Sequence, residues 1–160
     1  MSKKALRETL TVVSVVASLV FVGYEIRQNT IAARGSAYQA LGIATAQAWD
    51  SWAHDRQFQT VHQKPPEALD ASDWAQMIAK LTVFARLGET VYIQVEQGLL
   101  PPDAMERMGY AGFARAFRNP VYYCCWQAIK GGVSESYRDY MEATMTANPV
   151  DCSSYNVPWQ

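Results

Sequence analysis

An uncharged apolar run near the N-terminus constrains this chain more than any other feature of its sequence. From Leu10 to Tyr24 the sequence reads LTVVSVVASLVFVGY, and no charged residue interrupts it. Extended by one residue before and two after, the run holds 18 residues with a single charge, which at 1.5 Å per residue is about 27 Å of helix. The hydrocarbon core of a bilayer is about 30 Å thick. The run therefore predicts an uncleaved membrane anchor at residues 1–27 that crosses the bilayer once.

Two alternatives to a membrane anchor follow from the same run. As the core helix of a soluble fold, it needs other helices to cover a valine-rich rod on all sides. As a cleaved signal peptide, its basic start at Lys3, Lys4 and Arg7 fits, but no A-x-A-like cleavage site follows the run, which continues as EIRQN. Its nine strongly apolar residues contribute about −3 to −5 kcal/mol to insertion, offset in part by its hydroxyl groups. We expect the anchor to stay in the membrane.

The basic residues that flank the run set its expected orientation. Lys3, Lys4 and Arg7 precede the run, and Arg27 and Arg34 follow it. Because positive charge beside a transmembrane helix favours the cytoplasmic side, three basic residues against two place the N-terminus in the cytoplasm. The rest of the chain is then expected in the periplasm or outside the cell.

Weakly polar residues recur along one side of the run. Thr11, Ser14, Ser18 and Glu25 fall on a heptad-like seam, and Gly23 lies near its end. Small residues let transmembrane helices approach closely, and hydroxyl groups hydrogen-bond across them. The seam predicts packing against other transmembrane helices or against a second copy of the chain, with the lipid bilayer around them. The alternative is that the carboxylate only marks the membrane interface, beside a neighbouring arginine.

The remainder of the chain is expected to be helical. Alternating apolar and polar residues of the strand type are missing, whereas apolar residues recur at three- and four-residue steps. We expect an all-α fold in which the N-terminal transmembrane helix continues into a small helical-bundle domain at residues 28–149, followed by a loose tail at residues 150–160. Capping residues, glycines and prolines delimit the helices of this domain at about 28–53, 56–63, 70–98, 103–118, 121–130 and 134–147.

Charge and motif content exclude several classes of protein. The 14 basic residues and 15 acidic residues give a net charge of −1, so no basic surface is expected for a nucleic-acid backbone. No G-x-S-x-G, P-loop or G-x-G-x-x-G motif is present. We therefore expect no nucleic-acid partner and no cofactor, and no enzyme class is indicated.

One group of side chains could nevertheless bind a metal ion. Asp50 and His54 are four residues apart and would share a helix face, and His62 follows eight residues later. A carboxylate and two imidazoles are suitable ligands for a divalent cation. The alternative is a carboxylate–histidine pair on a polar surface.

The three cysteines offer a second kind of site. Cys124 and Cys125 are adjacent, and Cys152 lies near the C-terminus. In an oxidising compartment one of the adjacent pair could bond Cys152 and hold the tail, which would stabilise the fold by roughly 3–4 kcal/mol in the chain-entropy model. Alternatively, the cysteines are small apolar residues packed beside a tryptophan.

The order of these features resembles a group of uncharacterised bacterial membrane-anchored proteins. The resemblance lies in an apolar anchor ending in FVGYEIRQNT, an alanine-rich helix, a Trp-led helix ending near EQGLLP, and then FRNP and SESYRDYM, over roughly residues 5–147. It implies a helical protein of the bacterial inner membrane and brings no activity, cofactor or catalytic residue. The adjacent cysteines and the tail are not features of that group.

These features predict a protein whose role is interaction. The seam, the long helix and the absence of a catalytic signature favour an accessory or scaffold subunit of a membrane protein assembly. One alternative is a membrane-tethered metal-binding protein or hydrolase that uses Asp50, His54 and His62. Another is a ligand-sensing domain with a pocket lined by Trp74, Trp126 and Tyr92.

Overall fold

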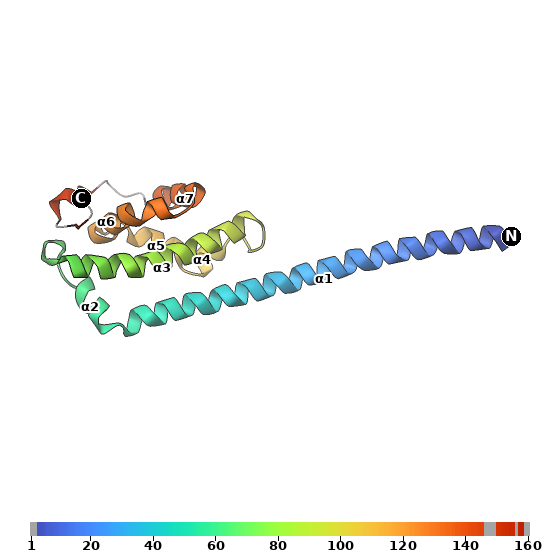
Figure 1. Ribbon diagram of the computed structural model, residues 1–160, viewed down its shortest axis with the longest axis horizontal. Coiled ribbons are helices and arrows are strands. Elements are labelled where there is room, and N and C mark those ends of the chain that lie inside the picture. The colour runs from blue at the N-terminus through green and yellow to red at the C-terminus, as the bar shows by residue number, and fades with distance from the viewer. Residues whose placement is uncertain (1–2, 146–149, 156, 159–160) are drawn as a thin grey trace. The chain divides into compact units, whose positions relative to one another are not determined.

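The computed structural model describes residues 3–145, 150–155 and 157–158 (Figure 1). Over these residues the chain forms seven α-helices, three short 3-10 helices and no strand, so the predicted all-α fold is confirmed. Two compact units divide the chain, Met1–Gln39 and Ala40–Gln160. The first unit extends beyond the predicted anchor at residues 1–27 because its helix continues past the apolar run before any of its residues becomes buried.

The first helix, α1 (Lys3–His54), is 52 residues long, which corresponds to about 78 Å. Only its last turns belong to the second unit. There Leu41 and Thr45 are buried and Trp52 packs against the core. The Thr45 hydroxyl lies 2.9 Å from the hydroxyl of Tyr110, so this buried polar residue has a hydrogen-bond partner.

A short connection turns the chain from α1 into α2 (Arg56–His62). The carboxylate of Asp55 caps α2 by accepting a hydrogen bond from the backbone N–H of Phe58 at 3.0 Å. The ammonium group of Lys80 lies 3.0 Å from the same carboxylate and also donates to the carbonyl of Ser51. The Phe58 N–H and the lysine lower the pKa of Asp55. Lys80 therefore ties the end of α1 and the start of α2 to the next long helix.

That helix, α3 (Ala71–Glu96), follows the 3-10 helix η1 (Pro66–Ala68) and has both of its predicted ends. Asp70 caps its first turn in a capping box with Asp73. After its last turn, Gly98 adopts a left-handed conformation with φ of 66°. The ammonium group of Lys64 donates a hydrogen bond to the Asp73 carboxylate at 2.6 Å. This hydrogen bond is the largest cause of the lowered pKa of Asp73.

One predicted helix is wrong in its extent. The segment expected as a single helix at residues 103–118 forms α4 (Ala104–Arg107) and α5 (Tyr110–Ala116). Gly109 separates them with a φ of 83°, a conformation that interrupts the helix and that glycine adopts without steric cost. The break divides the segment into two short helices, and α4 packs against both α3 and α5.

The remaining helices lie over α3. They are α6 (Pro120–Ile129), the 3-10 helix η2 (Lys130–Gly132) and α7 (Glu135–Met145), and η3 (Cys152–Ser154) follows near the C-terminus. Asn119 caps α6 by accepting a hydrogen bond from the N–H of Val121 at 2.9 Å, and Pro120 occupies the first turn of the helix. The predicted limit of the domain at residue 149 lies outside the described residues.

The core of the second unit is rich in aromatic residues. Among the described residues, its seven largest fully buried side chains are aromatic: Phe58, Trp74, Phe84, Tyr110, Phe117, Trp126 and Tyr137. They lie on five helices, with Phe117 at the C-cap of α5. Edge-to-face contacts join several of them, with ring centroids 4.7 Å apart for Trp52 and Phe84 and 4.9 Å apart for Phe113 and Phe117. One continuous core therefore holds α3, α5, α6 and α7 together with the end of α1.

The described part of the C-terminal segment is not the loose tail that the sequence predicted. Cys152 and Val157 are buried and belong to the core, and Val150 and Tyr155 pack against it. The sequence offered a bond to Cys152 as a way to hold this segment, and the structure contains that bond. Two buried side chains and a covalent bond instead attach it to the bundle.

Replacing Gly88 with alanine is expected to destabilise the second unit strongly. A Cβ atom at this position would lie 3.0 Å from Cδ1 of Tyr110 and closer still to the hydroxyl of Tyr137. Overpacking of a well-packed core of this kind costs about 1–3 kcal/mol. Urea unfolding followed by circular dichroism measures the loss, and an unchanged midpoint would contradict the crowding.

The tyrosine hydroxyl provides a rescue for this variant, and another glycine provides its control. Within the described part of the chain the Tyr137 hydroxyl has no hydrogen-bond partner, so Tyr137→Phe alone should leave stability within about 1 kcal/mol of the original. Combined with Gly88→Ala, it should recover a large part of the lost stability. A methyl group added at Gly42 would meet no atom within 4 Å, so Gly42→Ala should instead stabilise α1 by about 0.5–1 kcal/mol.

Candidate functional site

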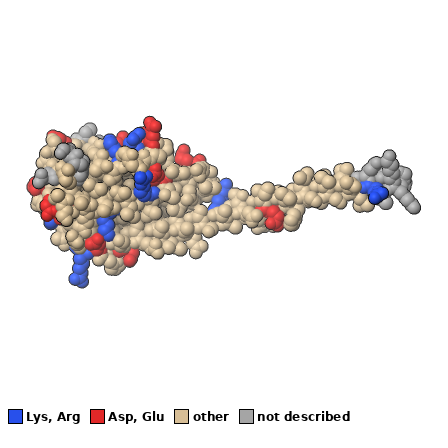
Figure 2. Space-filling view, viewed as in Figure 1, with Lys and Arg blue, Asp and Glu red and all other residues tan. Residues whose placement is uncertain are grey.

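The first candidate site is the apolar surface of α1. The large apolar residues from Leu10 to Val22 are each between 51% and 68% exposed. No part of the most apolar 18-residue window of the helix is buried, and few charged groups interrupt this stretch (Figure 2). Among the described residues, α1 is the one helix that is long and apolar enough to cross a membrane. The described residues leave this surface uncovered, whereas a soluble core helix is mostly buried.

Two of the seam hydroxyls are bound within α1 itself. The Thr11 hydroxyl donates to the carbonyl of Arg7 at 3.0 Å, and the Ser18 hydroxyl donates to the carbonyl of Ser14 at 2.8 Å. A hydroxyl that bonds its own helix can lie in lipid without an unsatisfied donor. Ser14 is the seam residue whose hydroxyl has no partner within the described part of the chain. It is therefore the hydroxyl best able to bond a neighbouring helix.

Two further residues of the predicted seam differ in position. Glu25 lies seven residues after Ser18 on the same face, and the described residues offer it no ion-pair partner. Gly23 does not lie on the seam, because five residues of a regular helix turn it about 140° away from Ser18. The seam therefore consists of Thr11, Ser14, Ser18 and Glu25, and the glycine faces nearly the opposite side.

The structure does not bring the three predicted metal ligands together. The Asp50 carboxylate lies 3.1 Å from Nδ1 of His54, and both side chains are at least three-quarters exposed. His62 lies on α2, where its Nδ1 is 2.7 Å from the hydroxyl of Tyr122. Within the described residues no group of three His, Cys, Asp or Glu side chains could hold a metal ion. The predicted metal site is therefore wrong, because the turn after α1 directs the second histidine toward α6.

The cysteines do form a disulfide bond, between Cys124 and Cys152. Their Cα atoms are 5.6 Å apart, and the bond joins α6 to the C-terminal segment. Cys125 is free and buried, and burial raises its pKa to about 12. Because the thiolate is the nucleophile in thiol–disulfide exchange, a thiol that stays protonated leaves the neighbouring bond undisturbed.

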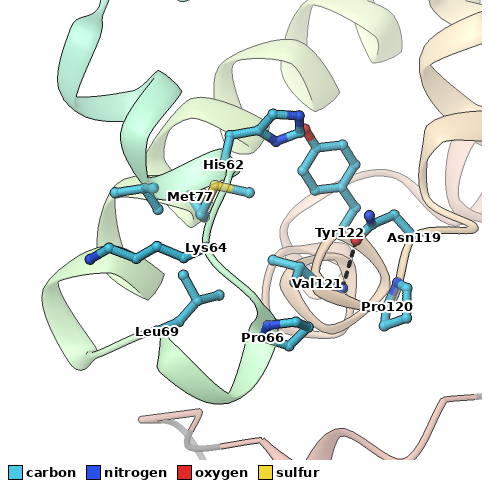
Figure 3. Close-up of a pocket in the computed structure, with 10 residues that line it drawn as sticks. His62, Lys64, Pro66, Leu69, Met77, Asn119, Pro120, Val121 and Tyr122 are labelled. Atoms are coloured by element: carbon cyan, nitrogen blue, oxygen red, sulfur yellow. Dashed lines mark hydrogen bonds between the residues drawn. The ribbon is translucent and has the colours of Figure 1, made fainter.

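A second candidate site is a hollow of about 310 Å³ in the second unit (Figure 3). We call it the His62 hollow. It lies between the end of α2 and the segment that joins α2 to α3, the second turn of α3 and the first turn of α6. Its lining is mostly apolar and consists of Val61, His62, Lys64, Pro66, Leu69, Met77, Asn119, Pro120, Val121 and Tyr122.

Tyr122 and Phe58 hold the imidazole of His62 in place beside this hollow. Burial and, to a lesser degree, the nearby Cys125 raise the pKa of Tyr122 to about 12, so its hydroxyl keeps its proton at neutral pH. The imidazole of His62 stacks between this ring and Phe58, with centroid distances of 5.5 Å and 6.0 Å. These contacts hold the histidine at the edge of the hollow.

The three residues Trp74, Trp126 and Tyr92 do not line the pocket expected of them. Both tryptophans are fully buried in the core, and Tyr92 contacts Tyr137 and Tyr140. Tyr122 was not among the predicted site residues, because it lies 60 residues from His62 and no local pattern connects the two. The aromatic residues at helical spacing therefore belong to the core. The hollow is lined mainly by the end of α2, the segment that follows it and the start of α6.

Comparison with protein-family models, with curated proteins and with solved structures finds no match for this chain. The fold and the two candidate sites are therefore interpreted from the residues and their geometry.

Proposed function

We propose that this chain is a single-pass membrane protein of helical fold that acts as an accessory or scaffold subunit of a membrane protein assembly. The observation that carries the proposal is the valine-rich surface of α1 from Leu10 to Val22, which is exposed on all sides. Exposed apolar surface of this extent is costly in water and favourable in lipid. The hydrogen bonds of Thr11 and Ser18 within the helix support the same environment.

We propose the bacterial inner membrane as its location, with the N-terminus in the cytoplasm and the second unit in the periplasm. Three basic residues before the apolar run against two after it favour this orientation. The bond between Cys124 and Cys152 supports it independently, because disulfides persist in oxidising compartments such as the periplasm. Tyr24 at the end of the run and Arg27 beyond it suit the membrane–water interface.

A cysteine at Glu67, an exposed position of the second unit, tests the orientation. With Glu67→Cys, a membrane-impermeant maleimide should label the chain in intact cells whose outer membrane has been permeabilised. The buried Cys125 should stay unlabelled in the parent chain. Labelling that requires disruption of the inner membrane would place the second unit in the cytoplasm instead.

The partner is another transmembrane helix or a second copy of this chain, held against the seam. Ser14 supplies a free hydroxyl, and Glu25 supplies a carboxylate that gains from a partner when it lies at the membrane boundary. On the opposite face, Val16 and Val20 present only apolar surface to lipid.

Cross-linking in native membranes tests this contact. Ser14→Cys and Ser18→Cys should give a cross-linked product with a short bismaleimide, whereas Val16→Cys and Val20→Cys, at matched depths on the other face, should give little. A product of twice the 17.9 kDa chain mass identifies a second copy, and a different mass identifies another protein. A monomer from all four variants, or equal products from both faces, would contradict the proposal.

A further inference from the structure

We propose that the His62 hollow binds a small carboxylate with a branched aliphatic body. This inference does not depend on the membrane anchor, because every residue of the hollow lies in the second unit. It rests on three observations. These are the volume and lining of the hollow, the hydrogen-bond donors of His62 and Asn119, and the ion pair between Lys64 and Asp73.

The walls of the hollow suit an aliphatic group. Val61, Leu69 and Met77 are buried side chains on one side, and Val121 lies on the other beside two prolines. Figure 3 shows Leu69, Met77 and Val121 around the open space, with the imidazole of His62 at its upper edge. A volume of about 310 Å³ lies at the small end of ligand pockets, which run from roughly 300 to 1,000 Å³. The occupant is therefore a small molecule.

The histidine that lines the hollow retains a donor. The Tyr122 hydroxyl lies 2.7 Å from Nδ1 of His62. Because this hydroxyl keeps its proton, we assign it as the donor of the hydrogen bond, which places the proton of the neutral imidazole on Nε2. The remaining arrangement, in which Nδ1 donates and Nε2 accepts, leaves a largely buried tyrosine hydroxyl without an acceptor and is disfavoured.

Asn119 presents the second donor. Its Oδ1 accepts the hydrogen bond from the N–H of Val121, which fixes the orientation of the amide and leaves its NH₂ group for other partners (Figure 3). The ammonium group of Lys64 is already bound to Asp73, so the lysine contributes its alkyl chain and the aspartate charge is neutralised. Two donors among the lining residues, with the nearby Asp73 carboxylate neutralised by Lys64, favour a ligand with a carboxylate oxygen.

Nuclear magnetic resonance of the full chain in detergent micelles tests the proposal, because the sequence contains two histidines and their ring C–H signals can be followed separately. The probe is 4-methylpentanoate, and His54→Phe assigns the signals. Titration should shift the His62 signal to saturation and leave the His54 signal unchanged. The uncharged 4-methylpentan-1-ol should bind at least about tenfold more weakly, because a charge-assisted hydrogen bond is lost.

Two variants test the proposed contacts. Asn119→Asp keeps a good N-cap for α6 but replaces the NH₂ donor with an anionic oxygen, so the carboxylate should bind at least about tenfold more weakly while the melting temperature stays close to that of the parent. Val121→Phe fills the hollow and should abolish saturable binding of both compounds. His54→Phe is the matched control and should bind as the parent does.

Three results would overturn the proposal. Equal shifts of both histidine signals would show partition of the acid into the micelle. Unchanged affinity in Asn119→Asp would remove the carboxylate contact, and the absence of a saturable shift at high millimolar probe would remove the site.

Discussion

Replacing Val16 and Val20 with arginine is expected to move the chain from the membrane to the aqueous fraction. Both side chains lie in the middle of the apolar run, on the face opposite the seam, and are more than half exposed. An arginine near the centre of a transmembrane helix costs about 2.5–3.5 kcal/mol on insertion scales. Two of them exceed the roughly −3 to −5 kcal/mol that the nine strongly apolar residues contribute. Carbonate washing of membranes followed by immunoblotting measures the change.

The matched control places the same charges on the second unit. Val83 and Ile93 on α3 are also exposed apolar residues, and Val83→Arg with Ile93→Arg should leave the chain in the membrane pellet. Retention of the Val16→Arg, Val20→Arg chain after washing would contradict the anchor. The intact mass of the parent chain distinguishes an uncleaved anchor from a cleaved signal peptide, because cleavage would leave a product well below 17.9 kDa.

The helices of the bundle were largely predictable because their ends carry local signals. In the structure, the side chains of Asp70 and Asn119 cap the starts of α3 and α6, and Gly98 adopts a left-handed conformation after the end of α3. The break at Gly109 was not predictable from the apolar pattern, which continues across it. A single left-handed residue changed the direction of the chain there, and such a change depends on tertiary packing as well as on the glycine.

The candidate sites were predictable only where the signal is local in sequence. The apolar run and the seam could be identified because neighbouring positions repeat along one helix. The contacts of His62 with Tyr122 and of Thr45 with Tyr110 join residues 60 and 65 positions apart, so only the fold brings them together. The metal hypothesis failed for the same reason, since helical spacing predicted the Asp50–His54 pair but not the direction of the next helix.

Sequence alone also left open which of the adjacent cysteines pairs with Cys152. Successive residues of a helix point about 100° apart, so only one of the two can face the C-terminal segment. In the structure this residue is Cys124, and Cys125 faces the core beside Tyr122. The choice follows from the rotation of α6 about its axis, which the packing of Trp126 and Val121 fixes.

Cys124→Ala is expected to lower the stability of the second unit by roughly 3–4 kcal/mol, because it opens a covalent loop of 28 residues. Cys125→Ala removes a buried sulfur of the same size but no covalent bond, so it should cost about 1 kcal/mol and is the matched control. Urea unfolding of the oxidised proteins measures both values. Reduction should lower the stability of the parent and of Cys125→Ala by similar amounts and leave Cys124→Ala unchanged.

Counting free thiols in denaturant makes the assignment of the bond unambiguous. The chain has three cysteines, so one disulfide leaves one thiol in the parent, none in Cys125→Ala and two in Cys124→Ala. If Cys125 could replace its neighbour, Cys124→Ala would keep a bond to Cys152 and show no free thiol. The buried, protonated state of Cys125 disfavours that exchange, since burial raises its pKa to about 12. A single free thiol in the parent isolated from native membranes would also show that the second unit folds where disulfides form, whereas three would contradict both the bond and the proposed orientation.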